Sequence, residues 1–121
     1  MPIYSHKDLI VWQKGILLCK VVYKATEEFP KSEIYGITSQ MRRSAVSIPS
    51  NIAEGRSRKT TKDFLHFLSI ALGSASELET QIEIAKELSF LPEQNYIKIN
   101  QLLAEVSKMI MGLVKKLDAK S

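Results

Sequence analysis

The residues best suited to chemistry in this chain are its arginines, all of which lie between positions 42 and 58. The lysines, in contrast, are spread along the whole chain. A guanidinium group is planar and donates paired hydrogen bonds, so it grips flat anions in a two-pronged way. Two lysines lie within four residues after the last arginine. The sequence therefore predicts a nucleic-acid-binding surface made of Arg42, Arg43, Arg56, Arg58, Lys59 and Lys62.

The residues that precede Arg56 and Arg58 are predicted to form a helix. Apolar residues recur there at the three- and four-residue steps of one helix face, at Ile37, Met41, Ala45, Ile48 and Ile52. Arg42 and Arg43 then lie at the sides of that face. Pro49 predicts a kink near residues 46–47, because proline removes one helical N–H and crowds the preceding turn. Gly55 is the expected end of the helix.

A further helix should begin directly after the basic connection. Thr60 and Asp63 have the three-residue spacing of a capping box. The nearby cations would then cluster at a helix N-terminus, whose free N–H groups also favour an anion. We expect ligand contact from Arg56, Arg58, Lys59 and Lys62, and the alternative is an ordinary solvated loop.

Arg42 and Arg43 have a structural interpretation that the sequence supports equally well. Glu77 and Glu79 lie on the following helix, and a buried guanidinium would need such a carboxylate as its partner. Glu83 follows on the same helix, so the chain should have a basic end and an acidic flank. The net charge of +4 and the pI near 9.2 permit binding to polyanions without requiring it.

The 121-residue chain is expected to form one all-α domain, 1–121, with helices at about 6–28, 33–55, 60–89 and 93–118. Ser5 and Asp8 have capping-box spacing, Pro30 closes the first helix and Pro92 suits the first turn of the last. Unbroken apolar seams mark the two later helices, at Phe64, Leu68, Ala71, Ala75, Leu78, Ile82 and Ala85, and at Ile99, Leu103, Val106, Ile110, Leu113 and Leu117. The short connections favour an antiparallel up-down-up-down four-helix bundle.

The first helix is apolar around most of its circumference. One face consists of Leu9, Trp12, Ile16, Cys19 and Tyr23. The remaining apolar residues would form an exposed patch unless another copy of the chain covers them. We therefore predict a homo-oligomer with an interface that includes Ile10, Val11, Leu17, Leu18 and Val22. The alternative is a helix at the centre of a monomeric core.

Gly73 lies in the middle of the third predicted helix, in a stretch that is rich in small residues. Glycine costs helix propensity there, so we expect a close approach by another backbone. The small residues around Ala45 and Ala53 of the preceding helix are the expected neighbours.

No residue pattern predicts an enzyme. Asp63 and His66 have the acid-x-x-His spacing of di-iron bundles, but such a site needs the motif twice and two further glutamates. We therefore expect no cofactor and no metal, with a di-iron oxidase as the weakest hypothesis. Cys19 is best explained as a small core residue. The chain has no apolar run of about 20 residues and no signal-peptide layout, so we expect a cytoplasmic protein without a membrane partner.

Two long stretches carry a resemblance to a known family. The run SQMRRSAVSIPSNIAEG followed by basic residues, and then DFLHFLSIALGSASELETQ, resembles the four-helix-bundle proteins encoded by intervening sequences in bacterial large-subunit (23S) ribosomal RNA genes. DLIVWQKG and EEFPKSEIYGIT extend the resemblance over nearly the whole chain. Ser44 replaces an expected alanine. This family includes the accessory variability determinant of diversity-generating retroelements.

The resemblance implies a ring-like homopentamer with a basic surface. For the retroelement members it also implies binding to nucleic acid and to a reverse transcriptase. Residues and resemblance together predict a non-enzymatic oligomer that offers repeated basic patches to RNA or DNA, largely without sequence preference. The competing hypothesis is a structural or adaptor protein that assembles with itself and binds no nucleic acid.

Overall fold

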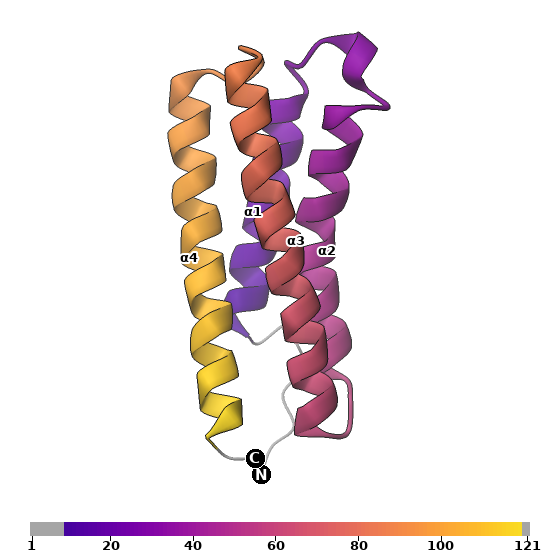
Figure 1. Ribbon diagram of the computed structural model, residues 1–121, viewed down its shortest axis with the longest axis vertical. Coiled ribbons are helices and arrows are strands. Elements are labelled where there is room, and N and C mark those ends of the chain that lie inside the picture. The colour runs from indigo at the N-terminus through magenta and orange to yellow at the C-terminus, as the bar shows by residue number, and fades with distance from the viewer. Residues whose placement is uncertain (1–8, 120–121) are drawn as a thin grey trace.

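Four α-helices form the molecule in the computed structural model, which describes residues 9–119. They are α1 (Ile10–Thr26), α2 (Ile37–Arg56), α3 (Thr61–Glu87) and α4 (Glu93–Asp118), with a short 3₁₀ turn, η2 (Lys31–Glu33), between α1 and α2. Successive helices run in opposite directions, and the α2–α3 turn lies at the same end as the last turn of α4 (Figure 1). The predicted all-α class with four helices is confirmed, and residues 9–119 contain no strand.

Each helix packs against its two neighbours around the bundle. Helix α2 contacts α1 and α3, and α4 contacts α1 and α3, whereas α2 and α4 occupy diagonally opposite corners. The apolar face predicted for α2 is buried from Ile37 to Ile52, and Leu68, Leu78 and Ile82 of α3 are fully buried against it. The predicted seam of α4 is buried from Ile99 to Ile110. These apolar faces hold the bundle together by removing their surface from water.

The helix ends differ from the predicted ends by a few residues. Helix α1 begins at Ile10, and the predicted cap at Ser5 and Asp8 lies outside the described residues. It ends at Thr26 because the chain tightens into a turn, in which the Phe29 N–H donates to the Thr26 carbonyl oxygen at 3.1 Å. Helix α2 begins one turn later than predicted, after Gly36, since η2 occupies the preceding residues.

The buried face of α1 is not the predicted apolar face, although Leu9, Trp12 and Cys19 of that face are partly buried against the core. The core face is Val11, Gly15, Leu18, Val22 and Ala25, all of them buried. Val11, Leu18 and Val22 therefore cannot line a surface between subunits, and their assignment to an oligomer interface was wrong. Both faces of α1 are apolar at helical spacing, so periodicity could not choose between them. Ile10 and Leu17 are exposed, as an interface requires.

Pro49 and Cys19 form a contact between α1 and α2 that explains how α2 accommodates a proline. Helix α2 continues through Pro49 from Ile37 to Arg56. Proline has no N–H to donate to the carbonyl oxygen of Ala45, one turn back. The Cys19 thiol donates to that oxygen instead, with Sγ and the oxygen 3.1 Å apart. Burial raises the pKa of Cys19 to about 11, so the thiol keeps its proton for this bond.

Gly15 of α1 lies close to another helix and Gly73 of α3 does not, a difference that the sequence did not predict. A Cβ at Gly15 would lie 3.3 Å from Pro49 Cβ, so Gly15 lets the proline pack against α1. A Cβ at Gly73 would meet nothing within 4 Å, and the predicted close approach there is wrong. The close contact between α2 and α3 lies one residue later, where the Ser47 and Ser74 hydroxyls are 2.7 Å apart.

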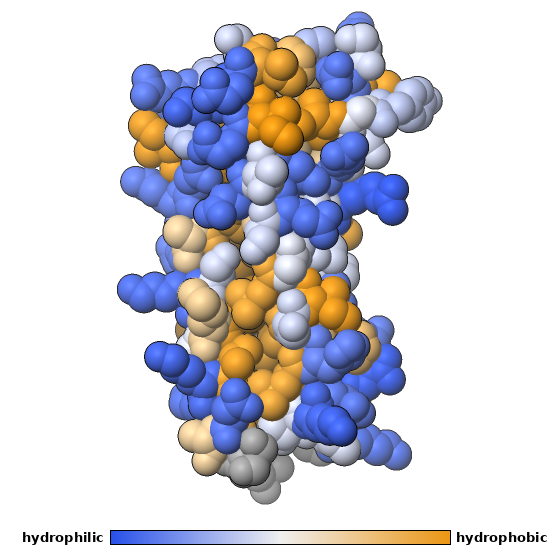
Figure 2. Space-filling view, in the orientation of Figure 1, coloured by the Kyte–Doolittle hydropathy of each residue, from blue (hydrophilic) through white to orange (hydrophobic). Residues whose placement is uncertain are grey.

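Apolar side chains also remain on the outside of the subunit. Figure 2 shows them gathered between α3 and α4 in the middle and lower part of the view. A groove of about 450 Å³ lies between these helices, and its apolar lining includes Leu72, Leu103 and Met111. Met111, which lines this groove, is exposed. Exposed apolar surface of this kind is typical of proteins that associate.

Candidate nucleic-acid interface

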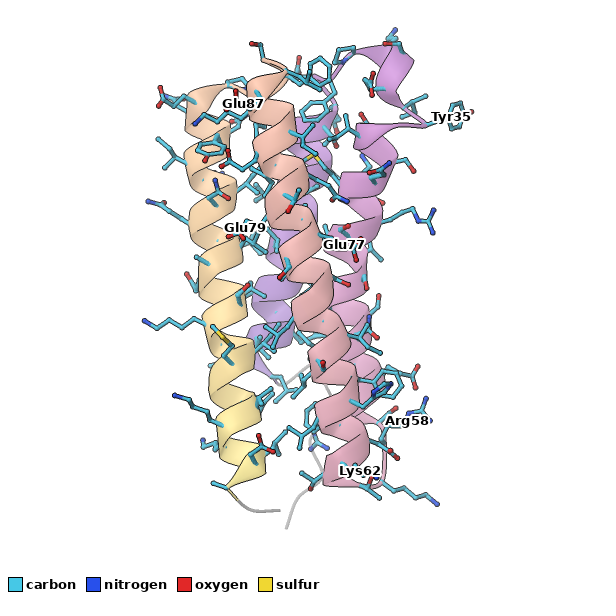
Figure 3. All side chains as sticks on the ribbon, in the orientation of Figure 1. Tyr35, Arg58, Lys62, Glu77, Glu79 and Glu87 are labelled. Atoms are coloured by element: carbon cyan, nitrogen blue, oxygen red, sulfur yellow. The ribbon has the colours of Figure 1, made fainter. Side chains whose placement is uncertain are left out.

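The basic connection forms the turn between α2 and α3. Thr60 is the N-cap of α3, and its Oγ1 accepts a hydrogen bond from the Asp63 N–H at 3.1 Å, which confirms the predicted cap. Arg58, Lys59 and Lys62 are exposed around this helix start, and Arg56 is partly buried. The label positions in Figure 3 place Arg58 and Lys62 at the same end of the molecule. We call Arg56, Arg58, Lys59 and Lys62 the basic end.

The Arg58 guanidinium is held in place on two sides. Its Nη2 lies 2.8 Å from Glu54 Oε2, one helical turn earlier, and its Cζ lies 4.8 Å from the centre of the Phe67 ring. An exposed ion pair of this kind contributes little to stability, because water screens both charges. The contacts orient the guanidinium at the surface, but Glu54 also neutralises part of the positive charge of the basic end.

Gly55 fixes the turn against the start of α3. A Cβ at this position would lie 2.8 Å from Phe64 Cδ1 and 2.9 Å from Phe67 Cβ, closer than real contacts. The absence of a side chain therefore lets α2 end directly against the two phenylalanines. Helix α2 runs one residue past Gly55, to Arg56, so the glycine serves close packing more than it stops the helix.

The last turn of α4 lies at the same end of the bundle as the basic end (Figure 1). It carries Lys115 and Lys116, both exposed, followed by Asp118. These lysines were not among the predicted nucleic-acid-binding residues, although the predicted directions of the helices already place them at this end. They widen the cationic surface beyond the α2–α3 turn.

Arg42 has a structural role, and its partner is α1 and not a glutamate of α3. Its Nε donates to Thr26 Oγ1 at 2.8 Å, and its Nη2 donates to the Tyr23 carbonyl oxygen at 3.4 Å. Its guanidinium also lies over the Tyr23 ring, with Cζ 4.6 Å from the ring centre. These contacts hold the guanidinium against α1 with two of its five N–H donors, so its geometry gives no support to the prediction that Arg42 faces a nucleic acid.

Arg43 is exposed and lies beside a polar groove between α2 and α3. The groove has a volume of about 300 Å³ and is also lined by Ser47, Ser74, Glu77 and Gln81. The expected ion pairs of Arg42 and Arg43 with Glu77 or Glu79 do not form among the described residues. Arg43 remains available to a ligand, but it lies about 20 Å along α2 from Arg56, given a helical rise of about 1.5 Å per residue.

The opposite end of the bundle has charges of both signs, and we call it the acidic end because its carboxylates outnumber Lys24, Lys31, Lys86 and Lys98. It carries Glu27 and Glu28 at the end of α1, Glu33 in η2, Glu87 at the end of α3 and Glu93 at the start of α4. The Glu83 carboxylate also accepts a hydrogen bond from Tyr96 Oη, which raises the pKa of the Tyr96 phenol. The charge asymmetry thus runs from end to end of the bundle.

The predicted acidic flank along α3 is divided between two sides of that helix. Glu77 lines the groove beside α2, and Glu79 lines the groove beside α4. Figure 3 shows the two labels on the corresponding sides of α3 and Glu87 near its end. The residues of the acid-x-x-His spacing, Asp63 and His66, are both exposed, and residues 9–119 hold no group of three His, Cys, Asp or Glu side chains arranged for a metal ion.

The chain therefore has the fold of a helical bundle with cationic side chains gathered at one end. The model of the 23S rRNA-intervening sequence protein family matches residues 7–112, and the chain belongs to this family. No described helix has the length and apolar character needed to cross a membrane. No match is found among the curated proteins.

A solved structure supports the same assignment. It is the crystal structure of a protein of unknown function from the S23 ribosomal protein family of Bacteroides thetaiotaomicron, which is 26% identical to this chain. The alignment covers 88% of this chain and 99% of that one, with a TM-score of 0.79. Neither comparison matches the chain to an enzyme family.

Proposed function

We propose that the protein is a non-enzymatic, self-assembling helical bundle that presents its basic end to RNA or DNA. The observation that carries the proposal is the cluster of Arg58, Lys59 and Lys62 around the N-terminus of α3, with Arg56 beside it. Phosphate is the ligand that such a cluster suits, because cationic side chains and free helix N–H groups both favour an anion.

Binding of this kind is largely independent of sequence. Phosphate contacts position a nucleic acid but carry little base information. The nearest aromatic rings, Phe64 and Phe67, are partly buried, and Phe67 is covered by Arg58. They offer no platform on which unpaired bases would stack. Affinity then depends on charge and on how many basic ends act together.

Self-assembly would strengthen the interaction. A single basic end makes few phosphate contacts, but a ring that repeats it several times converts later contacts into intramolecular ones. The exposed apolar side chains of α1, including Ile10 and Leu17, support association. A pentamer, and a reverse transcriptase or another protein as partner, are part of this proposal through the family resemblance alone.

The test is the salt dependence of binding to arbitrary single-stranded RNA and duplex DNA, measured by fluorescence anisotropy. If each copy contacts about three phosphates, the logarithm of the binding constant falls with that of the salt concentration with a slope of about −3 per copy on duplex DNA. Replacing Arg56, Arg58 and Lys59 together by glutamine should abolish most of the affinity and flatten the slope.

A charge-matched control separates this site from the net charge. Glutamine at Lys20, Lys86 and Lys108 removes the same number of charges outside the basic end. It should leave most of the affinity in place, with the oligomeric state of both variants checked by light scattering. Equal losses in the two triple variants, or affinity that hardly changes with salt, would contradict the proposal.

The alternative function is that of a structural or adaptor protein whose exposed apolar surface serves assembly alone. The Arg58–Glu54 ion pair favours it, because a paired guanidinium is partly neutralised. An assembled wild-type protein with no affinity for either nucleic acid at low salt would establish this alternative.

A further inference from the structure

Tyr35 is an aromatic side chain with almost no contact to its own subunit. It is 95% exposed, and the neighbouring Ile34 is 46% exposed. Figure 3 shows Tyr35 projecting outward from the α2 side of the bundle, at the acidic end. An aromatic ring left in water loses the burial that usually stabilises it, and aromatic residues are the commonest anchors of protein interfaces.

The turn that carries Tyr35 is ordered by its own hydrogen bonds. The Ile34 N–H donates to the Lys31 carbonyl oxygen at 3.2 Å, and the Gly36 N–H donates to the Glu33 carbonyl oxygen at 2.9 Å. Glu33 Oε1 also accepts from the Ile37 N–H at 3.4 Å, which joins the turn to the start of α2. Because the backbone is already fixed, docking of the ring costs less conformational entropy.

A surface cavity at the same end of the bundle is large enough to receive an aromatic ring. It lies between α1 and α4 and has a volume of about 270 Å³. A cavity of about 150 Å³ is enough to hold a benzene ring. Apolar atoms come from Val21 and Ala25, and polar groups come from Lys24, Glu27, Glu28, Asn95 and Lys98. This combination suits tyrosine, which has an apolar ring and a polar hydroxyl.

We propose that Tyr35 of one copy inserts into the α1–α4 cavity of a second copy. The inference rests on the self-assembly in the proposed function and names the contact that produces it. Tyr35 projects beside α2, and the cavity adjoins α4, at the diagonally opposite corner of the bundle. The contact is therefore head-to-tail, and each copy has one projecting ring and one cavity.

The position of the two features favours a closed ring of copies. Head-to-tail contacts generate a ring when the rotation closes and a filament when each copy also shifts along the axis. Tyr35 and the cavity lie at the same end of the bundle, so neighbouring copies need no shift along the helices. The basic ends of all copies then lie together at the other end of the ring.

The surface beside the cavity continues the proposed interface. Leu17 is 43% exposed and lies one helical turn before Val21 on the same side of α1. Ile10 belongs to the same stripe, and Lys14 between them pairs with Glu105 of α4 at 2.9 Å, which shows that the stripe faces the α4 side. Both sides of the contact carry charges of both signs, with Lys31 and Glu33 beside Tyr35 and with Glu27, Glu28, Lys24 and Lys98 lining the cavity, so opposite charges can pair across it.

The first experiment measures molar mass by light scattering during size exclusion. Tyr35→Ala should reduce an assembled wild type to single chains of 13.7 kDa, and Tyr35→Phe should remain assembled because it keeps the ring. Asn95→Trp, which fills the cavity from its rim, should have the same effect as Tyr35→Ala. Ile84→Ala is the control, since it removes an exposed apolar side chain from α3, away from Tyr35 and the cavity.

The second experiment mixes the two dissociated variants. Tyr35→Ala keeps an intact cavity and Asn95→Trp keeps an intact Tyr35, so the mixture should form a complex of two chains, whereas neither variant does so alone. Circular dichroism confirms that each is folded, and Lys98→Trp replaces Asn95→Trp if the latter is not.

The outcomes separate this inference from the proposed function. A monomeric wild type would overturn both the self-assembly and the Tyr35 contact. An assembled wild type whose Tyr35→Ala variant stays assembled would overturn the Tyr35 contact alone. Dissociated variants that fail to pair on mixing would also overturn it, because the ring and the cavity would then not be complementary.

Discussion

The bundle has an arginine stacked on an aromatic ring near each end, and the two arginines differ in what else they contact. Near the acidic end, Arg42 lies over Tyr23 and donates hydrogen bonds to Thr26 and to a backbone carbonyl oxygen of α1. At the basic end, Arg58 of the α2–α3 turn lies over Phe67 of α3 and pairs with Glu54 of α2. The contacts of Arg42 reach residues sixteen and more positions away in the chain, whereas those of Arg58 lie within nine positions of it.

This difference decides which arginine is free to serve a ligand. Arg42 donates to Thr26 and to the Tyr23 carbonyl oxygen on α1, so moving it would break two hydrogen bonds between α1 and α2. Glu54 is exposed, and water can replace Arg58 beside it at little cost. Both arginines lie over an aromatic ring at a similar distance, but Arg42 joins two helices by hydrogen bonds, whereas Arg58 is a cation at the surface.

The two ends also differ in how closely other atoms surround their glycines, Gly55 at the basic end and Gly36 at the acidic end. Replacing these glycines by alanine should give the largest difference in the free energy of unfolding. Gly55→Ala places a Cβ against Phe64 and Phe67 and should lower the free energy of unfolding by about 1–3 kcal/mol. Gly36→Ala meets only Glu33 Oε1, which can swing away with the loss of its contact to Ile37, so we expect a loss below about 1 kcal/mol.

Urea denaturation at one protein concentration, followed by circular dichroism, measures both losses. Gly112→Ala is the control, because a Cβ there meets nothing within 4 Å and should raise the stability by about 0.5–1 kcal/mol through helix propensity. A Gly55→Ala variant as stable as Gly112→Ala would show that the basic end is not tightly packed.

The two adjacent arginines of α2 provide the next comparison. Arg42→Ala should lower the free energy of unfolding by about 1–2 kcal/mol, because it removes charged hydrogen bonds and the contact with Tyr23. Arg43→Ala should change it by less than about 0.5 kcal/mol, since its side chain is exposed. The same denaturation experiment measures both, and equal effects would contradict the structural role of Arg42.

The sequence predicted the helices well because the apolar seams of α2, α3 and α4 each have one unambiguous face. It failed on α1, where both Val11–Leu18–Val22 and Trp12–Ile16–Tyr23 have helical spacing. The first of these sets is buried because it packs against α2 and α4. Gly15 lies on the same face, where the lack of a side chain lets Pro49 of α2 pack closely. Local pattern carries no information on such a choice when a helix is apolar on all sides.

The candidate site was predictable in part for a similar reason. Thr60 and Asp63 lie three residues apart in the chain, so the helix start among the basic residues could be predicted from local spacing. The partner of Arg42 lies sixteen residues away on another helix, and the sequence suggested glutamates of α3 because it offered no way to rank Thr26 above them. Tyr35 was missed because exposure depends on the path of the chain around it.

The smallest expected effect tests whether Glu54 restrains the basic end. A unit charge about 6 Å from a phosphate contributes about 0.7 kcal/mol in water, so Glu54→Gln should raise the affinity for nucleic acid roughly threefold at low salt. Stability should change by less than about 0.5 kcal/mol, because the Arg58–Glu54 pair is exposed. Titrations of duplex DNA at several salt concentrations measure the gain, which should disappear as salt screens the charge.

Glu87→Gln is the matched control for this charge. It removes the same carboxylate from α3 at the acidic end and should leave the affinity unchanged, since a screening length of about 10 Å at 0.1 M salt is shorter than the bundle. A gain confined to Glu54→Gln locates the bound phosphates beside the α2–α3 turn. Equal gains in both variants would instead mean that net charge alone governs binding, and the two ends would then be equivalent toward a polyanion despite their different arginines.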